Sequence, residues 1–95
     1  MNTPEGRLTR RISNYLKKVP GLYYAKIGGQ AKQRAGLPDY VICYKGQFIG
    51  LEVKAPQNKR GLTDRQRNEL IKIRRAGGES YVAQSLVAVK KRFPL

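Results

Sequence analysis

The sequence contains no histidine and only one cysteine, Cys43, among its 95 residues. The lack of histidine excludes imidazole-based acid–base catalysis and histidine-ligated metal sites. A single cysteine excludes an internal disulfide and a cysteine-built zinc site, so we expect Cys43 to be a small buried residue. No apolar run approaches the roughly 20 residues of a membrane span, and no signal-peptide pattern is present. We therefore expect an intracellular protein.

Acidic residues are also scarce. Lys and Arg total 20 against 6 Asp and Glu, which gives a formal net charge of +14. Such a field attracts polyanions, so nucleic acid is the predicted partner and an anionic membrane surface the weaker alternative. Any acid–base or metal chemistry must then use carboxylates, lysine, tyrosine, amides or water. The six acids available for it are Glu5, Asp39, Glu52, Asp64, Glu69 and Glu79.

The length suits one domain, residues 1–95, with a modest core, and a chain this short often gains stability as a homodimer. Thr3-Pro4-Glu5 is typical of a helix start, and Thr63 to Gln66 forms a capping-box pattern that opens a second helix. Apolar periodicity predicts a helix over 4–19, strands over 22–27, 39–44 and 48–54, a helix over 64–76, a strand over 80–83 and a short helix after Ser85. The second helix is a plausible crossover to a parallel strand, so we predict an α/β fold with a mixed four-stranded sheet flanked by helices.

Two carboxylates are predicted to face each other across a hairpin. If the middle strands pair around Lys45-Gly46, Asp39 lies opposite Glu52 on one face of the sheet. Two such carboxylates repel unless a cation lies between them, and Mg²⁺ prefers carboxylate oxygens. Lys54 follows Glu52 by two residues and points to the same face, where it would act on a water or a phosphate. The alternative is a structural ion pair between Lys54 and either acid.

These motifs resemble those of a known nuclease superfamily. Gly36 to Asp39, followed by Leu51 to Pro56, is similar to the Pro-Asp and Glu-X-Lys motifs of the PD-(D/E)XK, or restriction-endonuclease-like, nucleases. Within that superfamily the chain resembles the VRR-Nuc family over nearly its whole length. Only the segment 57–61 is more basic than the family pattern. Further matches lie at Thr3 to Arg7, Tyr23-Tyr24, Thr63 to Gln66 and Ala76 to Gly78.

The resemblance implies a helix, three strands, a helix and a strand as the core, and a metal-dependent phosphodiester hydrolase. It assigns Asp39, Glu52 and the Val53 carbonyl to Mg²⁺ or Mn²⁺, and makes Lys54 the catalytic lysine. Glu5 is then an additional metal or water ligand; the alternative is ordinary placement of an acid near a helix N-terminus. Gln66 is predicted to act in the active site, against the alternative of a capping-box partner for Thr63.

The resemblance also implies a substrate. Stand-alone domains similar to this one occur in phages, act as dimers and cut branched DNA such as four-way (Holliday) junctions. We therefore expect a homodimeric, structure-specific endodeoxyribonuclease in the cytoplasm of a bacterial or phage-infected cell, with a role in DNA repair. A flap endonuclease or nickase is the alternative within the family, and a non-catalytic basic nucleic-acid-binding protein the alternative outside it. Residues in and beside the basic loops are predicted to contact DNA: Gly29, Gln30, Lys32, Arg34, Lys59, Arg60 and Arg65.

Overall fold

The computed structural model describes residues 3–27 and 34–95. The predicted DNA contacts at Gly29, Gln30 and Lys32 lie outside these described residues. The elements in chain order are helix α1 (Pro4–Leu16), strands β1 (Leu22–Lys26), β2 (Tyr40–Tyr44) and β3 (Gln47–Val53), helix α2 (Asp64–Arg75), strand β4 (Glu79–Ala83) and helix α3 (Leu86–Arg92). The predicted order of elements is confirmed, with boundaries within a few residues of those expected.

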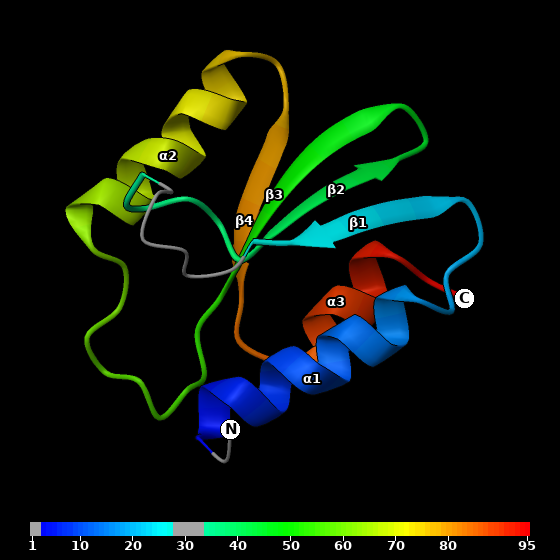
Figure 1. The fold of residues 1–95 in the computed structure, drawn as a ribbon, viewed down its shortest axis with the longest axis horizontal. Coiled ribbons are helices and arrows are strands. Elements are labelled where there is room, and N and C mark those ends of the chain that lie inside the picture. Colours follow the sequence, from blue (N-terminus) through cyan, green and yellow to red (C-terminus); the bar gives the residue numbers. More distant parts are fainter. Residues whose placement is uncertain (1–2, 28–33) are drawn as a thin grey trace.

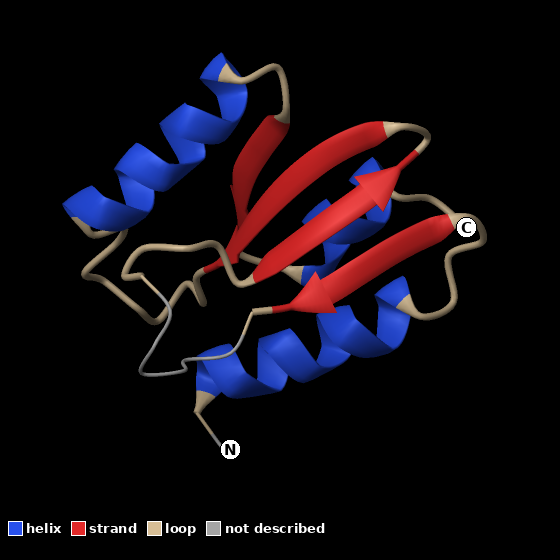
Figure 2. Ribbon diagram, turned by 45° about the horizontal axis from the view of Figure 1, so that its top comes forward, coloured by secondary structure: helices blue, strands red, loops and turns tan. Residues whose placement is uncertain are grey.

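The four strands form one mixed sheet in the order β1-β2-β3-β4. The pairs β1–β2 and β2–β3 are antiparallel, whereas β3 and β4 are parallel and joined by α2. Helices α1 and α3 pack together on one face of the sheet, and α2 covers the other face (Figures 1 and 2). The predicted α/β class, with a mixed sheet flanked by helices, is confirmed.

Local sequence signals account for these boundaries. The Thr3 side chain accepts a hydrogen bond from the Gly6 N–H, with Pro4 in the first turn of α1, which is the expected start of a helix. Between β2 and β3, Lys45 has φ of 52° and Gly46 has φ of 79°. Positive φ at both central residues is the geometry of a two-residue hairpin turn that matches the twist of its strands. This turn fixes the register of the hairpin.

The core lies between the sheet and the pair α1–α3. Apolar side chains from both helices and from strands β2, β3 and β4 are almost fully buried there, and the ring of Tyr44 packs edge-on against Phe93. Their burial supplies most of the free energy that holds the layers together. The buried members include Ile12, Leu16, Tyr40, Ile42, Ile49, Leu51, Ala83 and Val89.

The opposite face of the sheet is only partly covered. In the described part of the chain, α2 contacts β3 and β4 and no other strand. Cys43, on β2, is therefore exposed, and the expectation of a buried cysteine is wrong. Its register partners Tyr23 on β1 and Phe48 on β3 are exposed as well. None of the helices in residues 3–27 and 34–95 is long and apolar enough to cross a membrane.

Candidate active site

Asp39 and Glu52 meet at the end of the β2–β3 hairpin. The register pairs Ile42 with Ile49 and Tyr40 with Leu51, and one further step places Asp39 opposite Glu52, as the sequence predicts. Asp39 accepts a hydrogen bond at Oδ2 from the Val53 N–H over 2.7 Å. The backbone beside Glu52 therefore fixes the carboxylate of Asp39, and the two acids are held together by the strand pairing.

Glu52 is buried and Asp39 is half-buried, and the pKa values of both reflect it. The pKa of Glu52 is raised to about 7, chiefly by burial and next by the neighbouring Asp39 carboxylate, against the opposing effect of Lys54. Burial also raises the pKa of Asp39, although its hydrogen bond from Val53 and the charge of Lys26 act in the other direction. Two neighbouring acids whose pKa values are both raised form a site at which a cation would relieve the repulsion between their charged forms.

Lys54 is the basic residue nearest to Glu52 in the sequence, two positions after it. Its ammonium nitrogen lies 3.8 Å from Oε2 of Glu52, and its side chain is only 12% exposed. The ion pair that was the alternative interpretation is therefore present. At 3.8 Å it is a loose contact, longer than the 2.7–2.9 Å of a charge-assisted hydrogen bond. The ammonium group can therefore keep this contact and still donate to another oxygen.

Gln66 combines the two roles between which the sequence left a choice. Its side-chain oxygen accepts from the Thr63 N–H over 3.0 Å, and the Thr63 hydroxyl accepts from the Gln66 N–H, which completes the capping box of α2. The amide nitrogen of the same side chain donates to Oε2 of Glu52 over 3.0 Å. One amide thus caps a helix and orients an active-site carboxylate.

Glu5 reaches the segment that follows Lys54. Its Oε1 accepts hydrogen bonds from the Ala55 N–H at 3.1 Å and from the Asn58 side chain at 3.0 Å. Glu5 is also close enough to Asp39 to raise the pKa of that acid. The first helix is therefore tied to the site through Glu5, and Asn58 is a partner that the sequence analysis did not identify, because it depends on the path of a loop.

A basic cleft opens beside Asp39. The space, ≈ 570 Å³, is bounded by Glu5 and Asp39 at one end and by cations from α1 and β1 along its length. Those cations are Arg10, Lys17 and Lys26, none of which was among the predicted DNA contacts. Their position on the cleft wall follows from the packing of α1 beside β1, which no local pattern encodes.

The predicted DNA contacts inside the described ranges differ in their surroundings. Lys59, Arg60 and Arg65 are exposed. Arg34 is exposed too, but its guanidinium lies 3.0 Å from Oε1 of Glu69, a carboxylate only 9% exposed. Arg34 therefore ties the segment before Asp39 to α2, and its contact with DNA stays a prediction.

The donor set limits the kind of metal that the site would hold. In the described part of the chain, no three acidic or cysteine side chains gather closely enough to form a metal cage. A cation at Asp39 and Glu52 would be bound by two carboxylates and completed by backbone or water oxygens. This is a donor set of hard oxygens that suits Mg²⁺ or Mn²⁺ and does not suit zinc.

The architecture is similar to that of two solved nuclease-related structures. A VRR_NUC domain aligns with a TM-score of 0.73 and 25% sequence identity, over 94% of this chain and 92% of its own. The Holliday junction resolvase Hjc of the archaeal hyperthermophile Archaeoglobus fulgidus aligns with a TM-score of 0.63 and 24% identity, over 84% of this chain and 67% of its own. No family model and no curated protein matches the sequence. The resemblance to restriction-endonuclease-like nucleases of the VRR-Nuc type is thus confirmed by structure.

Proposed function

We propose that the protein is a metal-dependent endodeoxyribonuclease that hydrolyses phosphodiester bonds in branched DNA. The observation that supports this most strongly is the convergence of Asp39, Glu52, Lys54 and Gln66 at one end of a hairpin in a fold similar to a VRR_NUC domain. A protein that only coated nucleic acid would not need a pair of buried acids, each of which costs free energy to bury.

The residues fit a divalent cation. Asp39, Glu52 and the backbone carbonyl of Val53 would hold it, with Glu5 as a further ligand on the side of α1. When bound, the cation supplies an activated water and neutralises charge on the scissile phosphate. The raised pKa values of Asp39 and Glu52 support this assignment, since a cation between them would replace the protons that otherwise reduce their repulsion.

The side chains around the carboxylates have separate tasks. Lys54 lies where its ammonium group can donate to the scissile phosphate or to the attacking water, and its burial strengthens such a charged interaction. Gln66 positions Glu52, and the Val53 N–H positions Asp39. Glu5 holds the segment that follows Lys54 through the Ala55 N–H. Both carboxylates are thus oriented by a hydrogen bond from an adjacent element.

DNA would be drawn to this site by charge. The chain carries +14 overall, and Arg10, Lys17 and Lys26 line the cleft next to Asp39. Cations in this position neutralise backbone phosphates without reading the base sequence, so affinity should fall steeply with salt, because the release of counterions on binding becomes less favourable. Lys59, Arg60 and Arg65 would extend these contacts along the DNA.

We further propose four-way junctions as the substrate and a homodimer as the active form. The likeness to Hjc, a Holliday junction resolvase, supports this choice over a flap endonuclease or a nickase. In a twofold-symmetric dimer, two equivalent sites would cut opposing strands of one junction. The exposed residues Tyr23, Cys43 and Phe48 provide an apolar strip on the sheet for self-association.

A substrate panel tests the proposal. Labelled four-way junction, flap, splayed and linear duplex DNA of common sequence are incubated with Mg²⁺, with Mn²⁺ or with EDTA. We expect paired cuts in the junction that require either metal, and much slower cutting of linear duplex. Preferential cutting of flaps would instead indicate that the protein is a flap endonuclease. Tight binding of junctions with no cleavage in either metal would instead support a non-catalytic binding protein.

A further inference from the structure

Three spaces lie around the first turn of α1. The first is the cleft beside Asp39, and the second, ≈ 450 Å³, lies between that turn and the segment after Lys54. The third, ≈ 460 Å³, lies between α1 and the junction of β4 with α3, and we call it the Arg11 pocket. The first two spaces share Thr3 and Glu5, and the last two share Pro4, Ala55 and Gln57.

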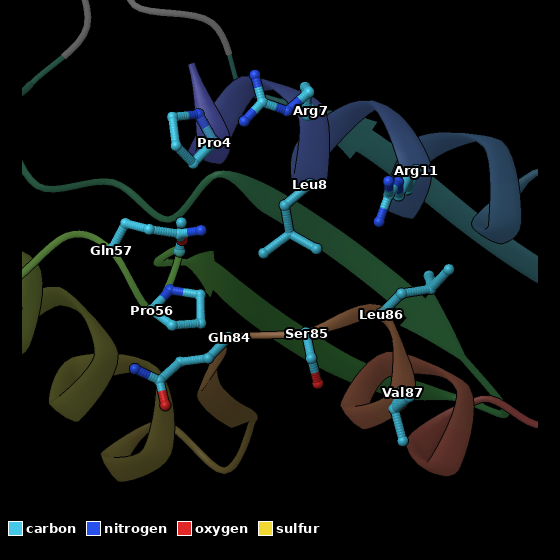
Figure 3. A pocket seen from close by; sticks show the side chains of 11 residues that line it. Pro4, Arg7, Leu8, Arg11, Pro56, Gln57, Gln84, Ser85, Leu86 and Val87 are labelled. Carbon is cyan, nitrogen blue, oxygen red and sulfur yellow. The ribbon is translucent and has the colours of Figure 1, made fainter. Parts of the chain in front are cut away.

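The Arg11 pocket has an apolar interior and a basic wall. Arg7, Leu8 and Arg11 come from α1, and the chain between Gln84 and Leu86 forms the facing wall (Figure 3). Leu8 points from the helix into the space between the two walls, and Gln57 closes one end (Figure 3). The pocket therefore offers aliphatic surface inside and amide and guanidinium groups at its rim.

The charged residues of the pocket are all basic, and both belong to the α1 wall. No acidic residue lines it, whereas Arg7 and Arg11 stand one helical turn apart on the same side of α1. Within residues 3–27 and 34–95, Arg11 takes part in no ion pair, so its fork of donors can bind an anionic group. Gln57 and Gln84 can both donate and accept hydrogen bonds.

These features fit one nucleotide better than they fit the outside of a duplex. A duplex keeps the faces of its bases stacked inside, so its outer surface of sugars, phosphates and base edges gains little from an enclosed apolar surface such as that of Leu8 and Leu86. An unpaired nucleotide presents an apolar base face, a polar base edge and a charged phosphate. The size of the pocket lies in the range of small-ligand sites. Unstacked bases are commonly bound in this way, with the base against side chains and the backbone on cations.

We propose that the Arg11 pocket holds an unpaired nucleotide of the DNA strand that passes through the active site, with its phosphate at Arg7 and Arg11. The proposal rests on the nuclease function proposed above and adds a site that would recognise a strand leaving its duplex. Ala55 links the two sites, since it follows Lys54, donates its N–H to Glu5 and lines the pocket. Flaps and splayed arms offer such a nucleotide directly, and a four-way junction offers one where a base pair opens at the branch point, whereas linear duplex offers none.

Metal-free binding measurements test the phosphate contacts separately from cleavage. Affinities of a fluorescein-labelled splayed duplex and of a blunt duplex are measured by anisotropy in EDTA over a range of salt. The double variant Arg7→Gln/Arg11→Gln should lower the salt slope for the splayed DNA by about 0.7, the contribution of the one phosphate contact to a single strand that both arginines share. The slope for blunt duplex should not change.

Arg75→Gln is the matched control, because Arg75 is an exposed arginine at the end of α2, on the other face of the sheet. It should leave the preference for splayed over blunt DNA intact. An equal loss on blunt duplex in the double variant, or the same loss in Arg75→Gln, would overturn the proposal, since either would show a general effect of charge.

A footprint tests the position of the nucleotide. Gln84→Cys, made in a Cys43→Ser background, introduces a single thiol at the pocket wall. With splayed DNA at about ten times its Kd, alkylation of the introduced thiol should slow by about tenfold, because only free protein reacts. Alkylation of a thiol placed instead at Arg75, at the exposed end of α2, should be unchanged.

The two proposals can fail separately. If the introduced thiol is not protected while the wild-type protein cuts junctions, the pocket assignment is wrong and the nuclease assignment stands. If the thiol is protected and the protein cuts no DNA in any metal, the pocket is a nucleotide site of a binding protein. That result would support the pocket and contradict the nuclease.

Discussion

The side chain of Gln66 donates a hydrogen bond to Oε2 of Glu52 over 3.0 Å while its oxygen accepts one from the N–H of Thr63, also over 3.0 Å. The start of helix α2 is thereby coupled to a carboxylate on strand β3. An amide is required for this arrangement, because the side chain must donate on one side and accept on the other.

Gln66→Glu separates these two roles. Glutamate keeps the acceptor that the capping box needs but places a second carboxylate against Glu52. We expect single-turnover cleavage of a four-way junction to fall by about 10- to 100-fold, the usual effect of losing a group that orients a metal ligand. Thr63→Ala is the control: it should cost about 1 kcal/mol of stability through loss of the cap and leave the cleavage rate near that of the wild type. A fully active Gln66→Glu variant would disprove the orienting role.

The burial of Glu52 predicts how stability depends on pH in the absence of metal. Its pKa is about 7 in the folded protein against an ordinary value of 4.5, so the folded state binds the proton more tightly than the unfolded state. The stabilisation from this proton is present below about pH 4.5 and is lost as the pH rises to about 7. In EDTA, Tm should therefore fall between pH 5 and pH 8.

Glu52→Gln isolates this effect from other titrating groups. The variant carries no charge at position 52 at pH 5 or at pH 8, so its Tm should fall less than that of the wild type over the same range. Mg²⁺ should raise the wild-type Tm more at pH 8 than at pH 5, because the cation binds the ionised carboxylate. Parallel pH curves for wild type and variant in EDTA would contradict the assigned burial cost.

Variants of Glu5 and Asn58 distinguish a role of Glu5 in binding the metal from a role in anchoring the segment after Lys54. Glu5→Gln retains an oxygen that can accept from the Ala55 N–H but removes the negative charge. We expect the metal concentration for half-maximal cleavage to rise about 10- to 100-fold in this variant, with little change in Tm. Asn58→Ala removes one hydrogen bond to Glu5 and should cost about 1 kcal/mol of stability with an almost normal metal requirement. Equal metal requirements in both variants would restrict Glu5 to the anchoring role.

Gly36 is predicted to be irreplaceable for a steric reason. It has φ of +91°, and a Cβ there would lie 2.6 Å from the backbone oxygen of Arg65 on α2. Gly36→Ala should lower the free energy of unfolding by about 2–3 kcal/mol through the combined strain and clash, and should slow cleavage by displacing the nearby Asp39. Gly61→Ala is the matched control, with φ of +69° and nothing within 4 Å of its added Cβ. Its cost should be limited to about 1–2 kcal/mol, and its cleavage rate should be near normal.

The parts of the site that sequence could predict are those set by local rules. The turn at Lys45-Gly46 fixes the hairpin register, and this register places Asp39 opposite Glu52. The capping pattern of α2 fixes the position of Gln66. These features depend on residues that are close in sequence or paired directly across a turn, so periodicity and turn chemistry are sufficient to find them.

The other parts depend on how separate elements pack. From the sequence alone, Glu69 would be expected to be an acid on the exposed side of a helix. It is nearly buried, because the segment with Arg34 lies against α2. Cys43 was expected in the core and is exposed, because α2 is positioned over β3 and β4. The cations beside Asp39 and the Arg11 pocket arise where α1 meets β1, α3 and the segment after Lys54. No local pattern specifies such contacts.

The central claim is that Asp39, Glu52 and Lys54 form a metal-dependent phosphodiesterase centre. It is tested most directly by single-turnover cleavage of a four-way junction by wild type, Asp39→Asn and Lys54→Gln at saturating protein, with Mg²⁺ and with EDTA. The account predicts cleavage by the wild type in Mg²⁺ and none in EDTA, with rates about 100- to 1,000-fold lower in each variant and junction binding retained. Cleavage by Asp39→Asn or Lys54→Gln at the wild-type rate would contradict the account.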